Sequence, residues 1–392
     1  MDRRTFLKAG STVGGVALAT LLLDACTTEA PSPAEPTATA SSEPTTAATA
    51  SSTPAAAPST VAAAPTATAN PSPTAEPSAS ATLNPTATRR PNMAKVAFIK
   101  TQDRADGIAR ALALLDYSPP QGGSVFLKPN FNSGDPTPGS THNDTLTALV
   151  RALQAGGAGR ITVGDRSGSA STRPSMERKG IFELAQELDF DALVFDEMGA
   201  DDWVMISGEG NHWQRGYAVA RPVIEADSVV QTCCLKTHRY GGHFTLSLKN
   251  SVGLVAKTVP GDDYNYMSEL HSSPFQRQMI AEINTAYRPD LVVLDGVLAF
   301  VDGGPAEGKL AETEVILAGV DRVAIDAVGV ALLRHHGTTR EVRRGAIFEQ
   351  EQIARAVELG LGVTGPEEIE LLTDDAESAT YAAEIRQLLL EG

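Results

Sequence analysis

The chain has 392 residues, of which 32 are basic and 48 acidic, for a net charge of −16. This charge argues against a nucleic-acid-binding protein, which needs a basic surface, and against a surface that binds anionic membranes. Of the three cysteines, only the adjacent pair Cys233 and Cys234 follows residue 26. Such a pair provides no disulfide scaffold and no ligand set for an iron–sulfur cluster, so we expect no such cluster on this chain.

Residues 1–26 predict an export signal with a lipid attachment site. The pair Arg3-Arg4 begins a twin-arginine pattern, and the uncharged stretch Ala9–Leu23 follows it. Its 15 residues are too few to cross a hydrocarbon core of about 30 Å, which takes roughly 20. Leu23-Asp24-Ala25-Cys26 then matches a lipobox in all but Asp24. We expect lipidated Cys26 to anchor the protein to the membrane outside the cytoplasm; the alternative is a plain secretory signal and a secreted or periplasmic protein.

Residues 27–92 predict a disordered tether. They consist almost wholly of Ala, Thr, Ser and Pro, with 12 of the 24 prolines. Such a composition cannot bury enough apolar surface to offset the entropy of ordering. The signal and the tether together contain 5 of the 32 basic residues and 6 of the 48 acidic residues. Residues 93–392 therefore contain 27 basic and 42 acidic residues, which gives them a net charge of −15. Any basic pocket in this part must therefore be local.

Residues 93–392 predict one α/β domain, or two intimate lobes. Short β-branched runs indicate strands at Val96–Ile99, Val125–Lys128, Ile161–Gly164, Leu193–Asp196, Val229–Thr232, Leu291–Asp295 and Val315–Gly319. Amphipathic stretches indicate helices at Arg104–Asp116, Asp144–Gln154, Ser175–Glu187, Phe275–Ala286, Arg322–Leu333 and Glu349–Glu358. This alternation favours a mostly parallel sheet with helices on both faces.

Several predicted strands end in, or run into, a charged residue. These residues are Lys128, Asp165, Asp196, Lys236 and Asp295. Ligands of open parallel sheets bind beyond the carboxyl ends of the strands, so the five endings suggest one shared site. The alternative is that they are capping or turn residues.

The segment Cys233–Asn250 has the highest density of residues that could do chemistry. Lys236, His238, His243 and Lys249 surround the turn Gly241-Gly242. Lysines can hold a carboxylate or a phosphate, and histidine exchanges protons near neutral pH. A metal held by the two histidines and a carboxylate is a less favoured variant, and a solvated basic loop is the alternative without function.

These segments together resemble the family called domain of unknown function 362. The resemblance rests on Phe126–Asn130, Gly164-Asp165, Leu235–His238, Leu248–Asn250, Leu294–Gly296, Gly303–Pro305, Asp321–Ala327 and Leu359–Gly362. Many members look like this domain joined to a ferredoxin-like segment with cysteine ligands, which this chain lacks. Any electron transfer would therefore need a separate redox partner to supply the electrons. The resemblance implies no defined activity.

We predict an extracytoplasmic enzyme acting on a small anionic substrate. Lys128, Lys236 and Lys249 would bind or polarise the substrate, His238 or His243 would act as acid or base, and Asp165 or Asp295 would orient them. One alternative is a tethered solute- or cofactor-binding protein without turnover. Another, a structural envelope protein, explains the tether but not the Lys/His cluster.

Overall fold

The computed structural model describes residues 93–168 and 170–392, so the signal, the lipobox and the tether lie outside the described residues. The described residues all belong to one compact unit, Leu83–Gly392. Its strands are β1 (Ala94–Lys100), β2 (Val125–Lys128), β3 (Ile161–Asp165), β4 (Asp191–Val194), β5 (Trp203–Ile206), β6 (Tyr217–Ala220), β7 (Ser228–His238), β8 (His243–Thr245), β9 (Leu291–Gly303), β10 (Gly308–Gly319) and β11 (Ile369–Leu372).

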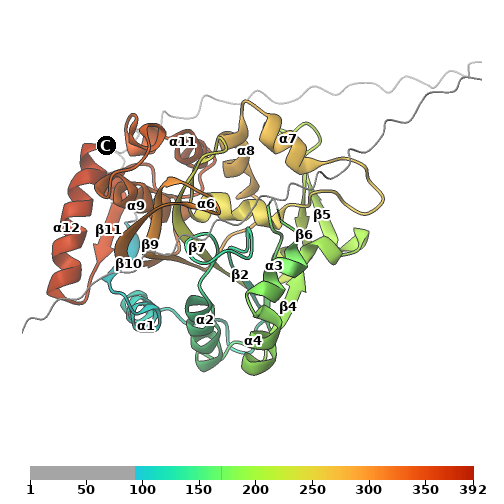
Figure 1. Cartoon of the computed structure of the whole chain (residues 1–392), viewed down its shortest axis with the longest axis horizontal. Coiled ribbons are helices and arrows are strands. Elements are labelled where there is room, and N and C mark those ends of the chain that lie inside the picture. The colour runs from blue at the N-terminus through green and yellow to red at the C-terminus, as the bar shows by residue number, and fades with distance from the viewer. Residues whose placement is uncertain (1–92, 169) are drawn as a thin grey trace, which may run out of the picture. The chain divides into compact units, whose positions relative to one another are not determined.

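The main sheet has the strand order β11-β1-β10-β9-β7-β2-β3-β4, and β8 pairs with β7. Most neighbours run parallel, including the consecutive row β9-β7-β2-β3-β4. β10 is antiparallel to both β1 and β9. β5 and β6 form a separate antiparallel hairpin. This arrangement confirms the predicted α/β class with a mostly parallel sheet (Figure 1).

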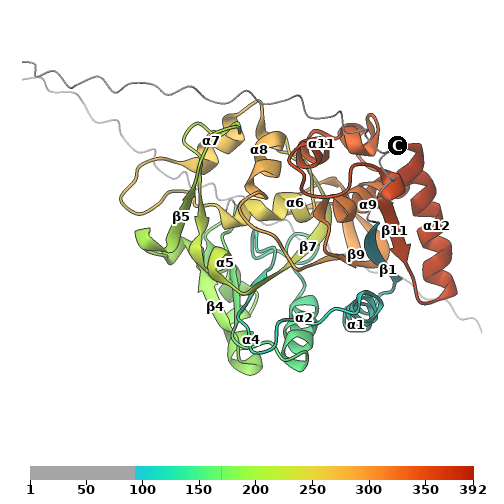
Figure 2. The same ribbon diagram turned by 180° about the vertical axis from the view of Figure 1, so that it is seen from behind.

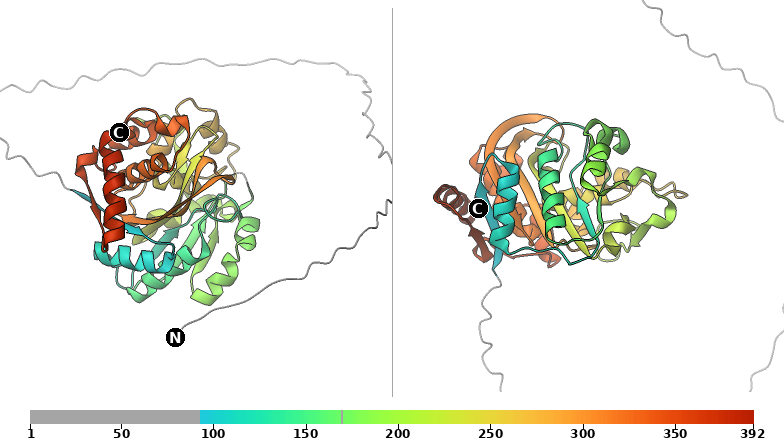
Figure 3. Two further views of the ribbon diagram at one scale, coloured as in Figure 1. Left: turned by 60° about the vertical axis from the view of Figure 1, so that its left-hand side comes forward. Right: turned by 90° about the horizontal axis from the view of Figure 1, so that it is seen from below.

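Helices cover both faces of the sheet (Figures 1 and 2). They are α1 (Arg104–Leu115), α2 (Asn143–Ala155), α3 (Thr172–Arg178), α4 (Ile181–Leu188), α5 (Arg221–Glu225), α6 (Ser247–Asn250), α7 (Tyr266–Ser272), α8 (Gln276–Ile283), α9 (Arg322–His335), α10 (Arg340–Arg343), α11 (Glu351–Glu358) and α12 (Ala376–Glu391). In the view from below, α1, α2 and α4 lie side by side across one face (Figure 3). No helix in the part of the chain that the structure describes is both long and apolar enough to span a bilayer.

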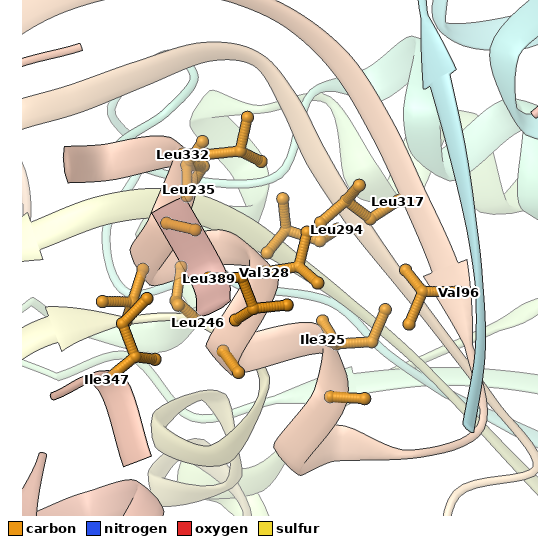
Figure 4. Close-up of a cluster of buried hydrophobic side chains, with 14 of the residues drawn as sticks. Val96, Leu235, Leu246, Leu294, Leu317, Ile325, Val328, Leu332, Ile347 and Leu389 are labelled. Atoms are coloured by element: carbon orange, nitrogen blue, oxygen red, sulfur yellow. The ribbon is translucent and has the colours of Figure 1, made fainter. Parts of the chain in front are cut away.

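Alternate residues of the central strands pack into two different apolar cores. Val96 and Leu294 face α9, α11 and α12, and Figure 4 shows them around Val328 of α9. Their sequence neighbours Ala97 and Val293 point to the opposite face of the sheet and pack against α1, α2 and α4. Because side chains of a strand alternate between its faces, burial on both sides explains the nearly continuous apolar runs in the sequence. A third core lies between the β5–β6 hairpin and α7 and α8.

The structure corrects two of the predicted elements. The single helix predicted at Ser175–Glu187 is two helices, α3 and α4, separated by Lys179 and Gly180. Gly180 has a φ of +67°, a left-handed conformation that ends one helix and redirects the chain into the next. The strand predicted at Leu193–Asp196 ends at Val194, and a 3₁₀ turn (Phe195–Glu197) follows it.

Candidate functional site

A cavity of about 480 Å³ opens at the carboxyl ends of β2 and β3, beside the last residues of β7. It contains five of the seven predicted site residues, namely Lys128, Asp165, Lys236, His238 and Lys249. Parallel neighbours β3, β2 and β7 present their carboxyl ends at one edge, which explains why residues far apart in sequence meet there.

Lys128 and Asp165 form a buried ion pair in the floor of the cavity. Their side chains are 1% and 2% exposed, and Lys128 Nζ lies 2.9 Å from Asp165 Oδ1. The backbone N–H groups of Phe131 and Arg166 donate to the carboxylate at 2.6 and 2.7 Å. Burial lowers the pKa of Lys128, whereas the charge of Asp165 opposes that shift. The pair is thus a fixed structural unit with one cation facing the cavity.

Gly253 lies directly against this ion pair. A Cβ atom at this position would overlap Asp165 Oδ1 and lie 2.9 Å from Lys128 Nζ. The 3₁₀ turn Ser251–Leu254, which holds Gly253, therefore packs its backbone onto the pair, and only glycine leaves the space.

Two asparagines connect Lys128 to Lys236. Lys236 Nζ donates to Asn130 Oδ1 at 2.9 Å and to the Gly139 carbonyl at 2.6 Å. The Asn130 amide donates to Asn250 Oδ1 at 3.0 Å, and that oxygen also accepts a hydrogen bond from Lys128 Nζ. Burial is the main cause that lowers the pKa of Lys236. Both ammonium groups are held by neutral oxygens and by Asp165, so the network carries excess positive charge.

Lys249 reaches the cavity from the short helix α6. Asp326 of α9 fixes the start of α6, because its carboxylate accepts hydrogen bonds from Ser247 N at 2.8 Å and Leu248 N at 3.2 Å. Lys249 is 8% exposed, and no hydrogen bond or ion pair joins its Nζ to another described residue. Burial, followed by the charges of Lys236 and Arg166, lowers the pKa of Lys249 to about 7.

His238, the last residue of β7, lies beside Lys249. Its Nδ1 is buried and has no hydrogen-bond partner among the described residues. Burial and the charges of Lys249 and Lys236 hold the pKa of His238 well below its ordinary value, so the ring is neutral at pH 7. A Cβ atom on Gly242 would lie 3.1 Å from His238 Nδ1 and 2.5 Å from Lys249 Cε, so both side chains pack against this glycine.

Two further cations complete the cavity wall. The buried guanidinium of Arg166 donates to three backbone carbonyls, those of Val255, Ser167 and Val252. Lys257 lies nearer the surface, 3.6 Å from Asp196. The lining thus has four lysines and one arginine against one carboxylate, inside a domain whose net charge is −15.

Two predicted site residues lie outside the cavity lining. Asp295 is inside β9 rather than at a strand end, and its carboxylate binds Arg104 at 2.8 Å and Thr145 at 2.7 Å. It therefore joins the sheet to α1 and α2. His243 is the first residue of β8, opposite His238 in the pairing of β7 with β8. Burial and the charge of Arg277 lower the pKa of His243.

The metal variant finds no support in this geometry. Within residues 93–168 and 170–392, no group of three or more His, Cys, Asp or Glu side chains could hold a metal ion. Cys233 and Cys234 are fully buried free thiols, and burial raises the pKa of both, that of Cys234 to about 11. Neither thiol is therefore reactive in this state.

Several lining residues were not predicted as site residues. They are Asn130, Asn132, Arg166, Thr245, Asn250, Lys257, Asn265, Met267, Ser268 and His271. Asn130 and Asn250 lie in segments that the sequence analysis singled out, at Lys128-Pro129-Asn130 and Lys249-Asn250, but neither was assigned a role in the site. Arg166 had a usable signal, since it follows Asp165 at a strand end. The residues from Asn265 to His271 belong to α7 and its N-cap, which the sequence patterns did not predict.

The described part of the chain is an α/β protein with a buried cationic cavity at the carboxyl edge of a parallel sheet. Residues 125–331 match the family model described as domain of unknown function (DUF362), and the chain belongs to this family. The match confirms the resemblance found in the sequence.

Two individual proteins are also similar. The thylakoid-associated protein sll1697 of Synechocystis sp. (strain ATCC 27184 / PCC 6803 / Kazusa) is 28% identical over 223 residues, which is 54% of this chain and 64% of that protein. The lactate racemase apoprotein from Thermoanaerobacterium thermosaccharolyticum aligns with a TM-score of 0.36 and 15% identity, covering 59% of this chain and 54% of that one.

Proposed function

We propose that this protein is an enzyme that acts on a small anionic substrate in the cationic cavity. The observation that carries the proposal is the charge of the lining: four lysines and an arginine face one carboxylate, deep inside an acidic domain. Unpaired buried charge is costly, so such a lining is stable chiefly when an anion completes it. A carboxylate or a phosphate group fits the donor set of Lys128, Lys236 and Lys249.

Catalysis, rather than binding alone, is favoured by the pair His238 and Lys249. Both groups have lowered pKa values, and neither His238 Nδ1 nor Lys249 Nζ has a hydrogen-bond partner among the described residues. A neutral imidazole beside an amine that titrates near pH 7 can accept and return a proton. A protein that only binds an anion would gain more from lysines that stay fully charged. In this proposal Asp165 orients Lys128 and is not in contact with the reacting atoms.

We also propose that the enzyme is exported and anchored through Cys26. The support is the order of Arg3-Arg4, an apolar stretch and a lipobox at the N-terminus. The relative from Synechocystis is named as thylakoid-associated. A lipid anchor would give such an association without a spanning helix.

Anion binding tests the site assignment. Calorimetry with oxalate and phosphate on the purified protein at pH 7 should detect binding, and Lys236→Met should weaken it at least 10-fold, because one buried cation is lost. Lys309→Met is the matched control, since Lys309 is an exposed lysine on β10. Unchanged affinity in Lys236→Met, or no binding of either anion to the unmodified protein, refutes the proposal.

Two further measurements keep this test decisive. If circular dichroism shows that Lys236→Met does not fold, Lys257→Met replaces it, because Lys257 is partly exposed and tolerates truncation. Native mass spectrometry of the purified protein then identifies any retained anion. Conversion of that anion by the unmodified protein but not by His238→Gln indicates an enzyme. Tight binding with no conversion indicates a binding protein instead.

A further inference from the structure

Lys249 differs from every other cation of the cavity. Within the described residues, Lys128 has Asp165 as a partner, Lys236 and Arg166 have carbonyl acceptors, and Lys257 lies near Asp196. Lys249 Nζ has none, although the side chain is more than nine-tenths buried. The amine borders the cavity, and an ammonium without a protein acceptor beside the charges of Lys236 and Arg166 is unfavourable, so the site favours the neutral amine, which is a nucleophile.

We propose that Lys249 is a covalent nucleophile that forms an imine with its substrate, and that the substrate is a small oxo-carboxylate. This inference rests on the proposed function, since it assigns the substrate class of the same cavity. The remaining cations, Lys128 and Lys236 among them, would hold the carboxylate. The unpaired amine of Lys249 would face the adjacent carbonyl carbon.

The geometry around Gly242 holds the amine in place. The aliphatic stem of Lys249 packs against the backbone of Gly242, where an added Cβ would lie 2.5 Å from Cε and 3.1 Å from Cδ. The stem is therefore confined, and the ordering of its rotatable bonds is completed during folding rather than during reaction. The same glycine contacts His238, so a proton acceptor lies beside the nucleophile.

The chemical step balances without an added oxidant or reductant. Lys249 Nζ attacks the carbonyl carbon and a C–N bond forms, while one Nζ proton is transferred to the carbonyl oxygen to give a carbinolamine. The C–O bond then breaks, and the hydroxyl group leaves as water with the second Nζ proton. His238, which packs with Lys249 against Gly242, would take up and return these protons.

Reductive trapping tests the inference. The purified protein is incubated with glyoxylate or pyruvate and sodium cyanoborohydride at pH 7, and intact mass and peptide mapping follow. We expect one adduct per chain, located on Lys249, with formation slowed by excess oxalate. Lys249→Arg and Lys249→Met should form no such adduct, because a guanidinium and a thioether are not amine nucleophiles. The exposed Lys309→Arg is the matched control and should be labelled like the unmodified protein.

The outcomes separate this inference from the proposed function. Oxalate binding without an adduct on Lys249 overturns the imine and leaves the anion site intact. An adduct distributed over exposed lysines, or one that persists in Lys249→Arg, also overturns it. If no anion binds at all, the proposed function fails as well.

Discussion

At the scale of single residues, Lys249 should reduce stability at neutral pH. In the folded protein burial and the neighbouring Lys236 and Arg166 lower its pKa from 10.5 to about 7, so the folded state binds fewer protons than the unfolded state between these values. The burial of Lys249 therefore costs no stability above pH 10.5, where the amine is neutral in both states. The cost grows as the pH falls and reaches its full size below pH 7. Lys249→Met should raise the free energy of unfolding at pH 6 by as much as about 5 kcal/mol, with little gain near pH 10.

Urea unfolding at pH 6 and pH 10 measures this difference. Lys309→Met serves as the control, because its exposed lysine gives no reason for a pH-dependent change. A Lys249→Met variant that is less stable than the unmodified protein at pH 6 would contradict the assignment of a poorly compensated buried amine. The predicted gain in stability with a loss of function is typical of residues kept for activity.

Strand direction accounts for most of the predicted site residues that the structure brings together in the cavity lining. Lys128 and Asp165 end adjacent parallel strands, so their proximity follows from the sheet class alone. Asp295 was grouped with them because the predicted strand Leu291–Asp295 ends at this residue, yet β9 continues through it to Gly303. No pattern in one sequence reveals that Asp295 binds Arg104 and Thr145, since those contacts join segments more than 100 residues apart.

At the scale of elements, α9 positions the side of the cavity that holds Lys249 through α6. Asp326, in the buried middle of α9, accepts from the backbone N–H groups of Ser247 and Leu248. Asp326→Ala leaves these buried donors unpaired, which costs on the order of 2 kcal/mol, and frees α6 to move with Lys249 and Asn250. We expect oxalate affinity, measured by calorimetry, to fall at least 10-fold.

Asp321 gives a matched control on the same helix. It caps the N-terminus of α9 by accepting from Ala324 N at 2.9 Å and has no bond to α6. Asp321 also accepts from Val363 N at 2.8 Å, so Asp321→Ala should cost on the order of 2 kcal/mol of stability, while oxalate affinity is unchanged. Equal losses of affinity in both variants would mean that general destabilisation of α9, not the position of α6, controls binding.

The elements that were predicted and those that were missed differ in how they are stabilised. Central strands such as β2 and β9 are buried on both faces and therefore form apolar runs that are visible in sequence. Three-residue β8 and four-residue α6 have no such periodicity and depend on contacts with β7 and Asp326. Thr245 of β8 and Lys249 and Asn250 of α6 line the cavity beside the strand ends. The fold class and the strand-borne side of the site could therefore be predicted, but the side formed by these short elements could not.

At the scale of the whole molecule, charge is divided between exterior and cavity. Residues 93–392 carry a net charge of −15, whereas the cavity lining is cationic. Long-range attraction therefore cannot guide an anion to this protein, and affinity must come from contacts at short range inside the cavity. Buried contacts are screened less by salt than surface charges are. This division would allow a strongly acidic protein to bind the anionic substrate that we propose.

The N-terminus makes a separate prediction about the whole chain. Replacing Arg3-Arg4 by Lys-Lys keeps the positive charge, so loss of export in a bacterial host with the twin-arginine pathway would indicate recognition of the arginine pair itself.

Cys26→Ser should still be exported but should shift from the membrane to the soluble extracytoplasmic fraction, because a single lost lipid site removes the anchor. Immunoblots of cell fractions measure both effects, with Lys8→Arg as the control. If Cys26→Ser stays in the membrane fraction, an anchor other than Cys26 holds the protein there.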